Sequence, residues 1–201
     1  EQNERKLVGM ILNAKATPVE TALKYIRPVN YPQPERSAML GLILGMAALR
    51  ADLGSVNKLI GLGAPVNYQV TIEPGQTPLY FAVAKAPIDQ GNSHYEGVIF
   101  ALIEAGAEIS PAIVTETLKR QSFYVLSAML NTGSPIPDEA LEIPTSEECR
   151  ELLLYHTAAR GELLKLKRLL AAGADPNTAI GPISALAAAM RDQEMTRHLL
   201  V

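Results

Sequence analysis

The most constraining feature of this 201-residue chain is one segment, residues 156–177, which has the pattern of two short helices joined by a turn. Ala158 and Ala159 are small where helices must approach closely, and the following Gly161 tolerates the positive φ of a tight turn. Leucines at helical spacing then form one apolar stripe: Leu163, Leu166, Leu169 and Leu170. Gly173 follows the stripe, as is typical of a left-handed helix C-cap. So short a unit cannot bury its stripe alone, so the segment predicts neighbouring copies of itself.

Two further segments repeat this pattern. In residues 47–67, paired alanines precede an apolar stripe and the sequence Gly63-Ala64-Pro65-Val66-Asn67. In residues 77–109, a Thr-Pro-Leu start precedes a similar stripe and the sequence Gly106-Ala107-Glu108-Ile109. These motifs resemble the ankyrin repeat, whose signature is a T-P-L-H-x-A-A helix, a turn, a second helix with paired leucines, and G-A-D-x-N. The resemblance covers nearly the whole chain and is strongest at 155–177.

The resemblance implies an all-α, ankyrin-repeat solenoid of about five to six helix-turn-helix repeats, folded as a single domain over residues 1–201. We expect residues 1–30 to be an N-terminal capping repeat and residues 178–201 to be a C-terminal partial or capping repeat. The repeats between them are expected at 31–67, 68–110, 111–137 and 138–177. A composition that is 48% hydrophobic but only 5% aromatic suits thin layers of Leu, Ala and Val.

Several stretches depart from a regular repeat. Residues 85–96 insert about eight residues between paired helices, and their Pro, Gly, Asn and Ser predict a loop. The loop that joins two repeats, called the finger, is at 68–76 about two residues longer than in the usual ankyrin pattern. Apolar and polar residues alternate along it, which is the period of a strand. Residues 134–146 hold three prolines, with one short helical turn expected at 138–141. In the last repeat we expect a helix over 183–190.

Composition and spacing argue against several classes of function. A net charge of −3 argues against a broad nucleic-acid surface. The longest apolar run, residues 38–49, is too short to span a bilayer. The histidines are too scattered for a metal site, so no metal, cofactor or small-molecule substrate is expected. Cys149 and His156 share a helix face but lie two turns apart, beyond the reach that a nucleophilic dyad needs. We therefore expect no catalysis.

The resemblance implies protein–protein recognition, because ankyrin arrays bind partners through their finger tips and first helices. We expect partner contacts from ten residues on that side: Tyr68, Val70, Ile72, Glu73, Tyr80, Ile88, His94, Tyr95, Arg50 and Arg160. For Tyr68 and Tyr95, contact with a partner and local packing both remain open. Lys165, Lys167 and Arg168 are expected to be the solvated back of an amphipathic helix.

Irregular repeats with one oversized loop suit a single co-adapted partner. We therefore expect an inhibitor or immunity protein, of bacterial origin, that binds and blocks a toxin or effector. The alternatives are an adaptor or secreted effector that docks a host protein, and an ankyrin module cut from a larger enzyme or channel. The chain opens without an initiator Met, which favours a processed or trimmed product. A single cysteine is compatible with either a bacterial periplasm or a cytoplasm.

Overall fold

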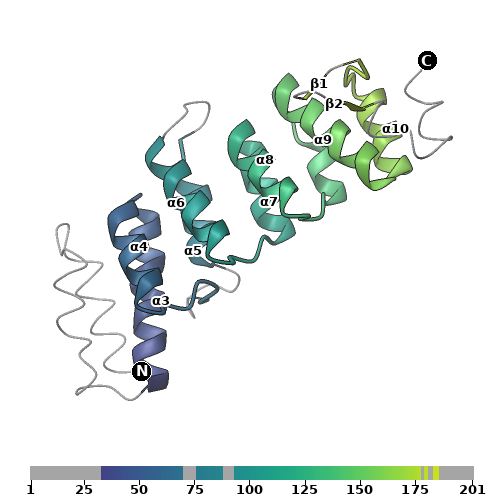
Figure 1. Cartoon of the computed structure of the whole chain (residues 1–201). Coiled ribbons are helices and arrows are strands. Elements are labelled where there is room, and N and C mark those ends of the chain that lie inside the picture. The colour runs from purple at the N-terminus through teal and green to yellow at the C-terminus, as the bar shows by residue number, and fades with distance from the viewer. Residues whose placement is uncertain (1–32, 70–75, 88–92, 178, 181–182, 186–201) are drawn as a thin grey trace. The chain divides into compact units, whose positions relative to one another are not determined.

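The computed structural model describes residues 33–69, 76–87, 93–177, 179–180 and 183–185 (Figure 1). Apart from one pair of two-residue strands, the secondary structure of these residues is helical, which confirms the all-α class. The chain divides into two compact units, Glu1–Ala86 with Asn92–Glu108, and Pro87–Gly91 with Ile109–Val201. The expected capping repeat at 1–30, most of the 68–76 finger and the centre of the 85–96 loop lie outside the described residues.

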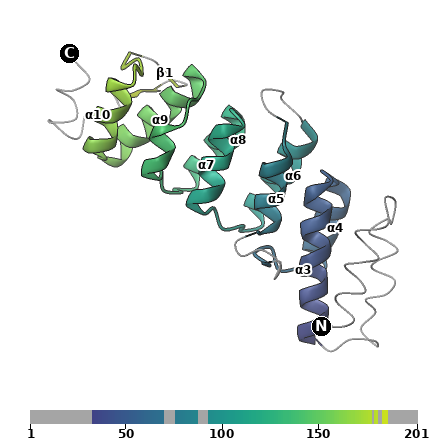
Figure 2. The same cartoon turned by 180° about the vertical axis from the view of Figure 1, so that it is seen from behind.

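The described part of the first unit consists of two helix pairs. Its helices are α3 (Gln33–Leu49), α4 (Leu53–Gly61), α5 (Pro78–Lys85) and α6 (Ser93–Glu104). Helix α3 packs against α4 and α5, while α6 packs against α5 and α4 (Figure 1, Figure 2). Each pair follows the helix–turn–helix pattern predicted from the alanines, glycines and apolar stripes.

Local capping determines where these helices begin and end. The Thr77 hydroxyl accepts a hydrogen bond from the Tyr80 amide at 3.2 Å, so α5 begins with a satisfied N-cap. Two residues after its last helical residue, each of α4 and α6 is followed by a left-handed glycine, Gly63 with φ 79° and Gly106 with φ 87°. Asn67 ties the two turns together: its Nδ2 donates to the Gly106 carbonyl at 3.2 Å, and its Oδ1 accepts from the Glu108 amide at 2.8 Å.

A buried glycine in α3 makes room for a tyrosine. A β-carbon placed on Gly41 would lie 2.4 Å from Cγ of Tyr68 and 2.9 Å from Cγ of Pro65. The Tyr68 side chain therefore packs directly onto the backbone of α3, which a larger residue at position 41 would prevent. This contact accounts for a glycine in the middle of a long helix, where alanine would otherwise be preferred.

Gly41→Ala is expected to lower the free energy of unfolding by about 1–3 kcal/mol, because the overpacking exceeds the roughly 1 kcal/mol that alanine gains in helix propensity. Urea denaturation followed by circular dichroism measures the change. Gly61→Ala in α4 is the matched control, because a β-carbon there meets no atom within 4 Å. Equal stability of the two variants would show that Tyr68 does not pack on α3.

The second unit continues with helix pairs but contains one irregular segment, residues 134–146. Its elements are α7 (Pro111–Lys119), α8 (Phe123–Asn131), the 3₁₀ helix η1 (Asp138–Glu142), α9 (Glu147–Arg160), α10 (Leu163–Ala171), β1 (Ala179–Ile180) and β2 (Ile183–Ser184). Helix α9 packs between α8 and α10, and η1 contacts α7 and α10. The short helical turn predicted at 138–141 is confirmed. Helices α8 and α10 are likewise followed two residues later by left-handed glycines, Gly133 and Gly173, with φ 88° and 87°.

One buried apolar cluster runs through the second unit. Its members come from α7 to α10, from the irregular segment and from the residues after α10: Val114, Leu118, Leu126, Leu130, Ile136, Ala140, Cys149, Leu152, Leu153, Leu154, Ala158, Leu166, Leu169, Ala174 and Ala185. Ile136 and Ala140 are each 1% exposed, so the irregular segment is a packed part of this core. Nowhere in the described ranges is a helix both long and apolar enough to cross a membrane.

Two expectations about loops and helices were wrong. The loop expected over 85–96 is shorter, because Lys85 is the last residue of α5 and Ser93 is the first residue of α6. The helix expected over 183–190 does not begin at Ile183, because Ile183 and Ser184 form a strand that pairs antiparallel with Ile180 and Ala179. β-Branched isoleucines favour this extended pairing, in which each strand satisfies backbone groups of the other.

Candidate functional site

The structure places the expected partner-binding residues in two different units. Arg50, Tyr68, Tyr80, His94 and Tyr95 lie in the first unit, and Arg160 lies in the second. Four others lie outside the described residues: Val70, Ile72, Glu73 and Ile88. Partner contact by any of these residues stays a prediction.

The tyrosines of the first unit have internal contacts. The Tyr95 hydroxyl donates to the Leu49 carbonyl at 3.1 Å and so fastens the start of α6 to the end of α3. Tyr80 lies edge-on to Phe81 with ring centroids 6.4 Å apart. For Tyr68 and Tyr95, the contacts therefore include the local packing that the sequence had left open. Tyr95 and His94 lie in the first turn of α6 rather than in a loop, and His94 is exposed.

Arg160, one of the expected partner-binding residues, caps a neighbouring helix. Its Nη2 donates to the Leu130 carbonyl at 2.8 Å, and its Nη1 donates to the Ser134 carbonyl at 2.6 Å. Leu130 lies in the last turn of α8, where carbonyl groups have no donor within the helix, and its carbonyl also accepts from the Gly133 amide beyond the helix. The guanidinium thus joins the end of α9 to the end of α8 and to the start of the irregular segment.

Arg160→Ala is expected to lower the free energy of unfolding by about 1.5–3 kcal/mol, because it leaves two carbonyl groups without their charged donor. Arg160→Lys should recover only part of the loss, since an ammonium lacks the planar fork that reaches both acceptors. Thermal and urea unfolding of the three proteins measure this order. An alanine variant as stable as the wild type would contradict the capping role.

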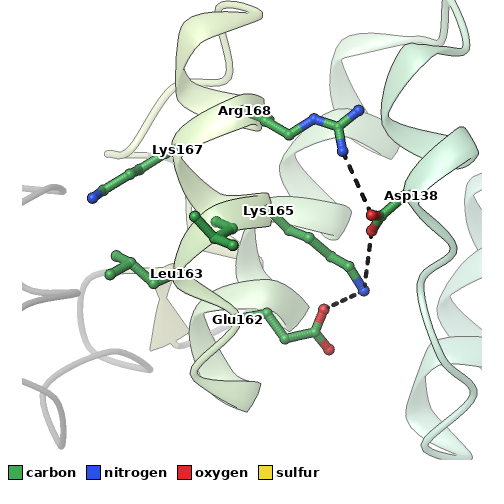
Figure 3. A pocket seen from close by; sticks show the side chains of 7 residues that line it. Asp138, Glu162, Leu163, Lys165, Lys167 and Arg168 are labelled. Atoms are coloured by element: carbon green, nitrogen blue, oxygen red, sulfur yellow. Dashed lines mark ion pairs between the residues drawn. The ribbon is translucent and has the colours of Figure 1, made fainter.

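A surface hollow of about 710 Å³ lies where α10 meets η1 (Figure 3). It is lined by Asp138, Glu162, Leu163, Leu164, Lys165, Lys167 and Arg168. Asp138 lies between Lys165 and Arg168, at 3.8 Å and 3.9 Å from their nearest nitrogens. The carboxylate of Glu162 forms an ion pair with Lys165, with 2.7 Å between the charged atoms. One edge of the hollow is therefore a chain of alternating charges.

Two of the three cations of α10, Lys165 and Arg168, hold the irregular segment. For these two, the expectation that they only face solvent was wrong. Lys165 donates to the Ile136 carbonyl at 2.6 Å, and its side chain is only 23% exposed. Arg168 pairs with Glu142 as well as with Asp138. Lys167 differs from both: it is exposed, points to the other side of α10 from Asp138, and pairs with no carboxylate in the described ranges (Figure 3).

Leu164, in the same hollow, is the functional candidate that sequence reasoning missed. It is 78% exposed, more than any other large apolar residue in the described part of the chain. The sequence offered one signal, because Leu164 stands outside the stripe of Leu163, Leu166, Leu169 and Leu170 and yet is not polar.

Leu164 has counterparts in α4, α6 and α8, the helices that come second in the other pairs. Nine residues before their left-handed glycines, α4, α6, α8 and α10 carry Gly54, Gly97, Tyr124 and Leu164. Tyr124 is 67% exposed, close to the 78% of Leu164. The first unit thus has glycine where the second unit presents large apolar side chains to solvent.

Cys149 and His156 are both buried in α9. Cys149 has no exposed surface, and its thiol is free. Burial, and to a lesser extent the positive charge of Arg160, together lower the pKa of His156 from its ordinary 6.5 to about 4. The imidazole also lies edge-on to Tyr155, with ring centroids 5.2 Å apart. In the described ranges, no three His, Cys, Asp or Glu residues gather closely enough to hold a metal ion.

A scan against models of known protein families finds no match for this chain, and a search of curated proteins finds none either. A functional assignment therefore rests on the residues and their geometry.

Proposed function

We propose that this chain is a non-catalytic protein-recognition module of the ankyrin-repeat type. The observation that carries the proposal is the turn that follows the second helix of each pair, α4, α6, α8 and α10. Each turn contains a glycine with φ between 79° and 88° whose amide donates to a carbonyl three residues earlier. In α4, α6 and α10, the following alanine amide donates to the carbonyl five residues earlier. One turn geometry that recurs at the same place in each helix pair is what a repeat array requires.

The bridge made by Asn67 adds support for a repeat array. It links the turns after α4 and α6, although its partners lie 39 and 41 residues away in the sequence. Such bridges join one repeat to the next and make the array rigid. A rigid array presents an extended surface whose side chains can vary without changing the fold, and repeat proteins use such surfaces to bind partners.

The role that fits best is a dedicated inhibitor, such as an immunity protein that binds and blocks a toxin or effector. Support comes from the irregular segment at 134–146, which Arg160, Lys165 and Arg168 hold through charged contacts. A departure from the repeat that is anchored this specifically suits one co-adapted partner better than a general scaffold.

Capture of a partner from the native cells tests the proposal. The full chain serves as bait, and each captured protein is then purified and assayed with increasing amounts of the chain. We expect one protein to bind at a fixed stoichiometry and to lose its enzymatic or toxic activity when saturated. A captured protein that stays fully active in the saturated complex would overturn the inhibitor role. Catalytic turnover by the chain itself would overturn the non-catalytic assignment.

A further inference from the structure

The exposed face of α10 combines an apolar centre with cationic edges. With 3.6 residues per turn, Lys167 and Arg168 lie three and four residues after Leu164 and flank it on the helix surface. Figure 3 shows Lys167 and Arg168 on opposite sides of α10. A large apolar side chain bordered by two cations matches the apolar centre and polar rim of protein interfaces.

Contacts within the chain show which chemistry this face accepts. Arg168 and Lys165 already hold carboxylates, those of Asp138, Glu142 and Glu162. The side chains of Asp138 and Glu142 are 70% and 73% exposed, so these pairs are open to solvent and to a partner. Lys167 is exposed beside Leu164 and forms no ion pair with a carboxylate within the described ranges. The hollow thus has three cations and two carboxylates in its lining, in a chain whose net charge is −3.

We infer that this face of α10 is a docking surface for an acidic, apolar segment of a partner protein. The inference rests on the proposed recognition function and identifies one surface and the partner chemistry for it. A partner carboxylate pairs with Lys167, while an apolar partner side chain covers the neighbouring Leu164. Partial desolvation by the leucine contact strengthens the ion pairs, which would be weak if fully exposed.

A pair of designed peptides tests this assignment on the full chain. The first is a fluorescein-labelled 16-residue peptide in which two leucines alternate with two glutamates. The second is its counterpart with lysine in place of every glutamate. Fluorescence anisotropy measures the dissociation constant of each. We expect the acidic peptide to bind at least tenfold more tightly than the basic one, a difference of ~1.4 kcal/mol, and to weaken as salt is raised.

Four variants locate the binding of the acidic peptide. Leu164→Ser and Lys167→Glu are each expected to weaken it at least tenfold. Tyr124→Ser is the matched control for an exposed apolar residue, because it occupies the equivalent position on α8 with no cation three or four residues after it. Lys85→Glu is the matched control for the charge change, on an exposed lysine of the first unit. Both controls are expected to change the dissociation constant less than twofold.

The outcomes separate this inference from the proposed function. No binding of the acidic peptide, equal binding of the two peptides, or binding that Leu164→Ser and Lys167→Glu leave intact would overturn the docking surface. A partner captured from cells that keeps its affinity for both variants would also overturn it while the recognition function stands. Loss of peptide binding in the two variants alone, with unchanged melting temperatures, would support it.

Discussion

Leu169→Ala is expected to lower the free energy of unfolding by about 2–5 kcal/mol, the range found when a buried leucine loses both its transfer energy and its packing. Leu169 is 2% exposed and belongs to the apolar cluster that joins α7, α8, α9 and α10. In a repeat array each unit is stabilised by its neighbours, so the loss should extend beyond α10 itself. Urea denaturation followed by circular dichroism measures the change.

The same helix supplies a control for this prediction. Leu164→Ala removes the same atoms from a side chain that is 78% exposed, so it should change the free energy of unfolding by less than about 0.5 kcal/mol. Comparison of the two variants separates the contribution of burial from that of helix propensity, because residue types and helix are identical. Equal losses in the two variants would contradict the burial of Leu169.

The second large effect is a dependence of stability on pH that comes from His156. Its pKa in the folded chain is about 4, below the ordinary value of 6.5. Between these two pH values the unfolded chain takes up a proton on His156 that the folded chain does not, so unfolding is favoured as pH falls. The stabilisation is complete above pH 6.5 and is lost as pH falls to about 4. The loss over this window is roughly 2–4 kcal/mol.

His156→Gln is expected to remove this component, so that its free energy of unfolding falls less steeply between pH 6.5 and 4 than that of the wild type. Carboxylates contribute to acid unfolding in both proteins, and the difference between the two slopes isolates the histidine. Parallel curves for His156→Gln and the wild type would show that His156 is not buried in its neutral form.

The docking surface and the anchored segment involve one group of charges on α10. Lys165 and Arg168 hold the irregular segment, whereas Lys167 lies on the other side of the helix, away from it (Figure 3). This division of roles allows Lys167 and Leu164 to be substituted without disturbing the packing of Ile136 and Ala140. It is why the binding test uses those two positions and leaves Lys165 and Arg168 unchanged.

Much of the local structure could be predicted from the sequence. The helix–turn–helix pattern around Gly63, Gly106 and Gly173, the apolar stripe of α10 and the helical turn expected at 138–141 all agree with the structure. These features depend on residues within about five positions of one another, because helix caps and apolar periodicity act over that range. The strand at Ile183 was missed because its backbone groups are satisfied by pairing with a second strand rather than within a helix.

By itself, the sequence determined that the chain forms short helices. Left-handed glycines follow these helices, and their apolar stripes must be buried. Only the tertiary structure decided what the polar and aromatic side chains do. Tyr95 binds a carbonyl 46 residues away, and Arg160 binds carbonyls 26 and 30 residues away. Their spacing in the sequence carries no sign of these acceptors, because a side chain selects its partner by position in space. The place of Leu164 outside the apolar stripe was the one sign in the sequence. The packing of the other leucines of α10 against the core shows that Leu164 is exposed beside Lys167.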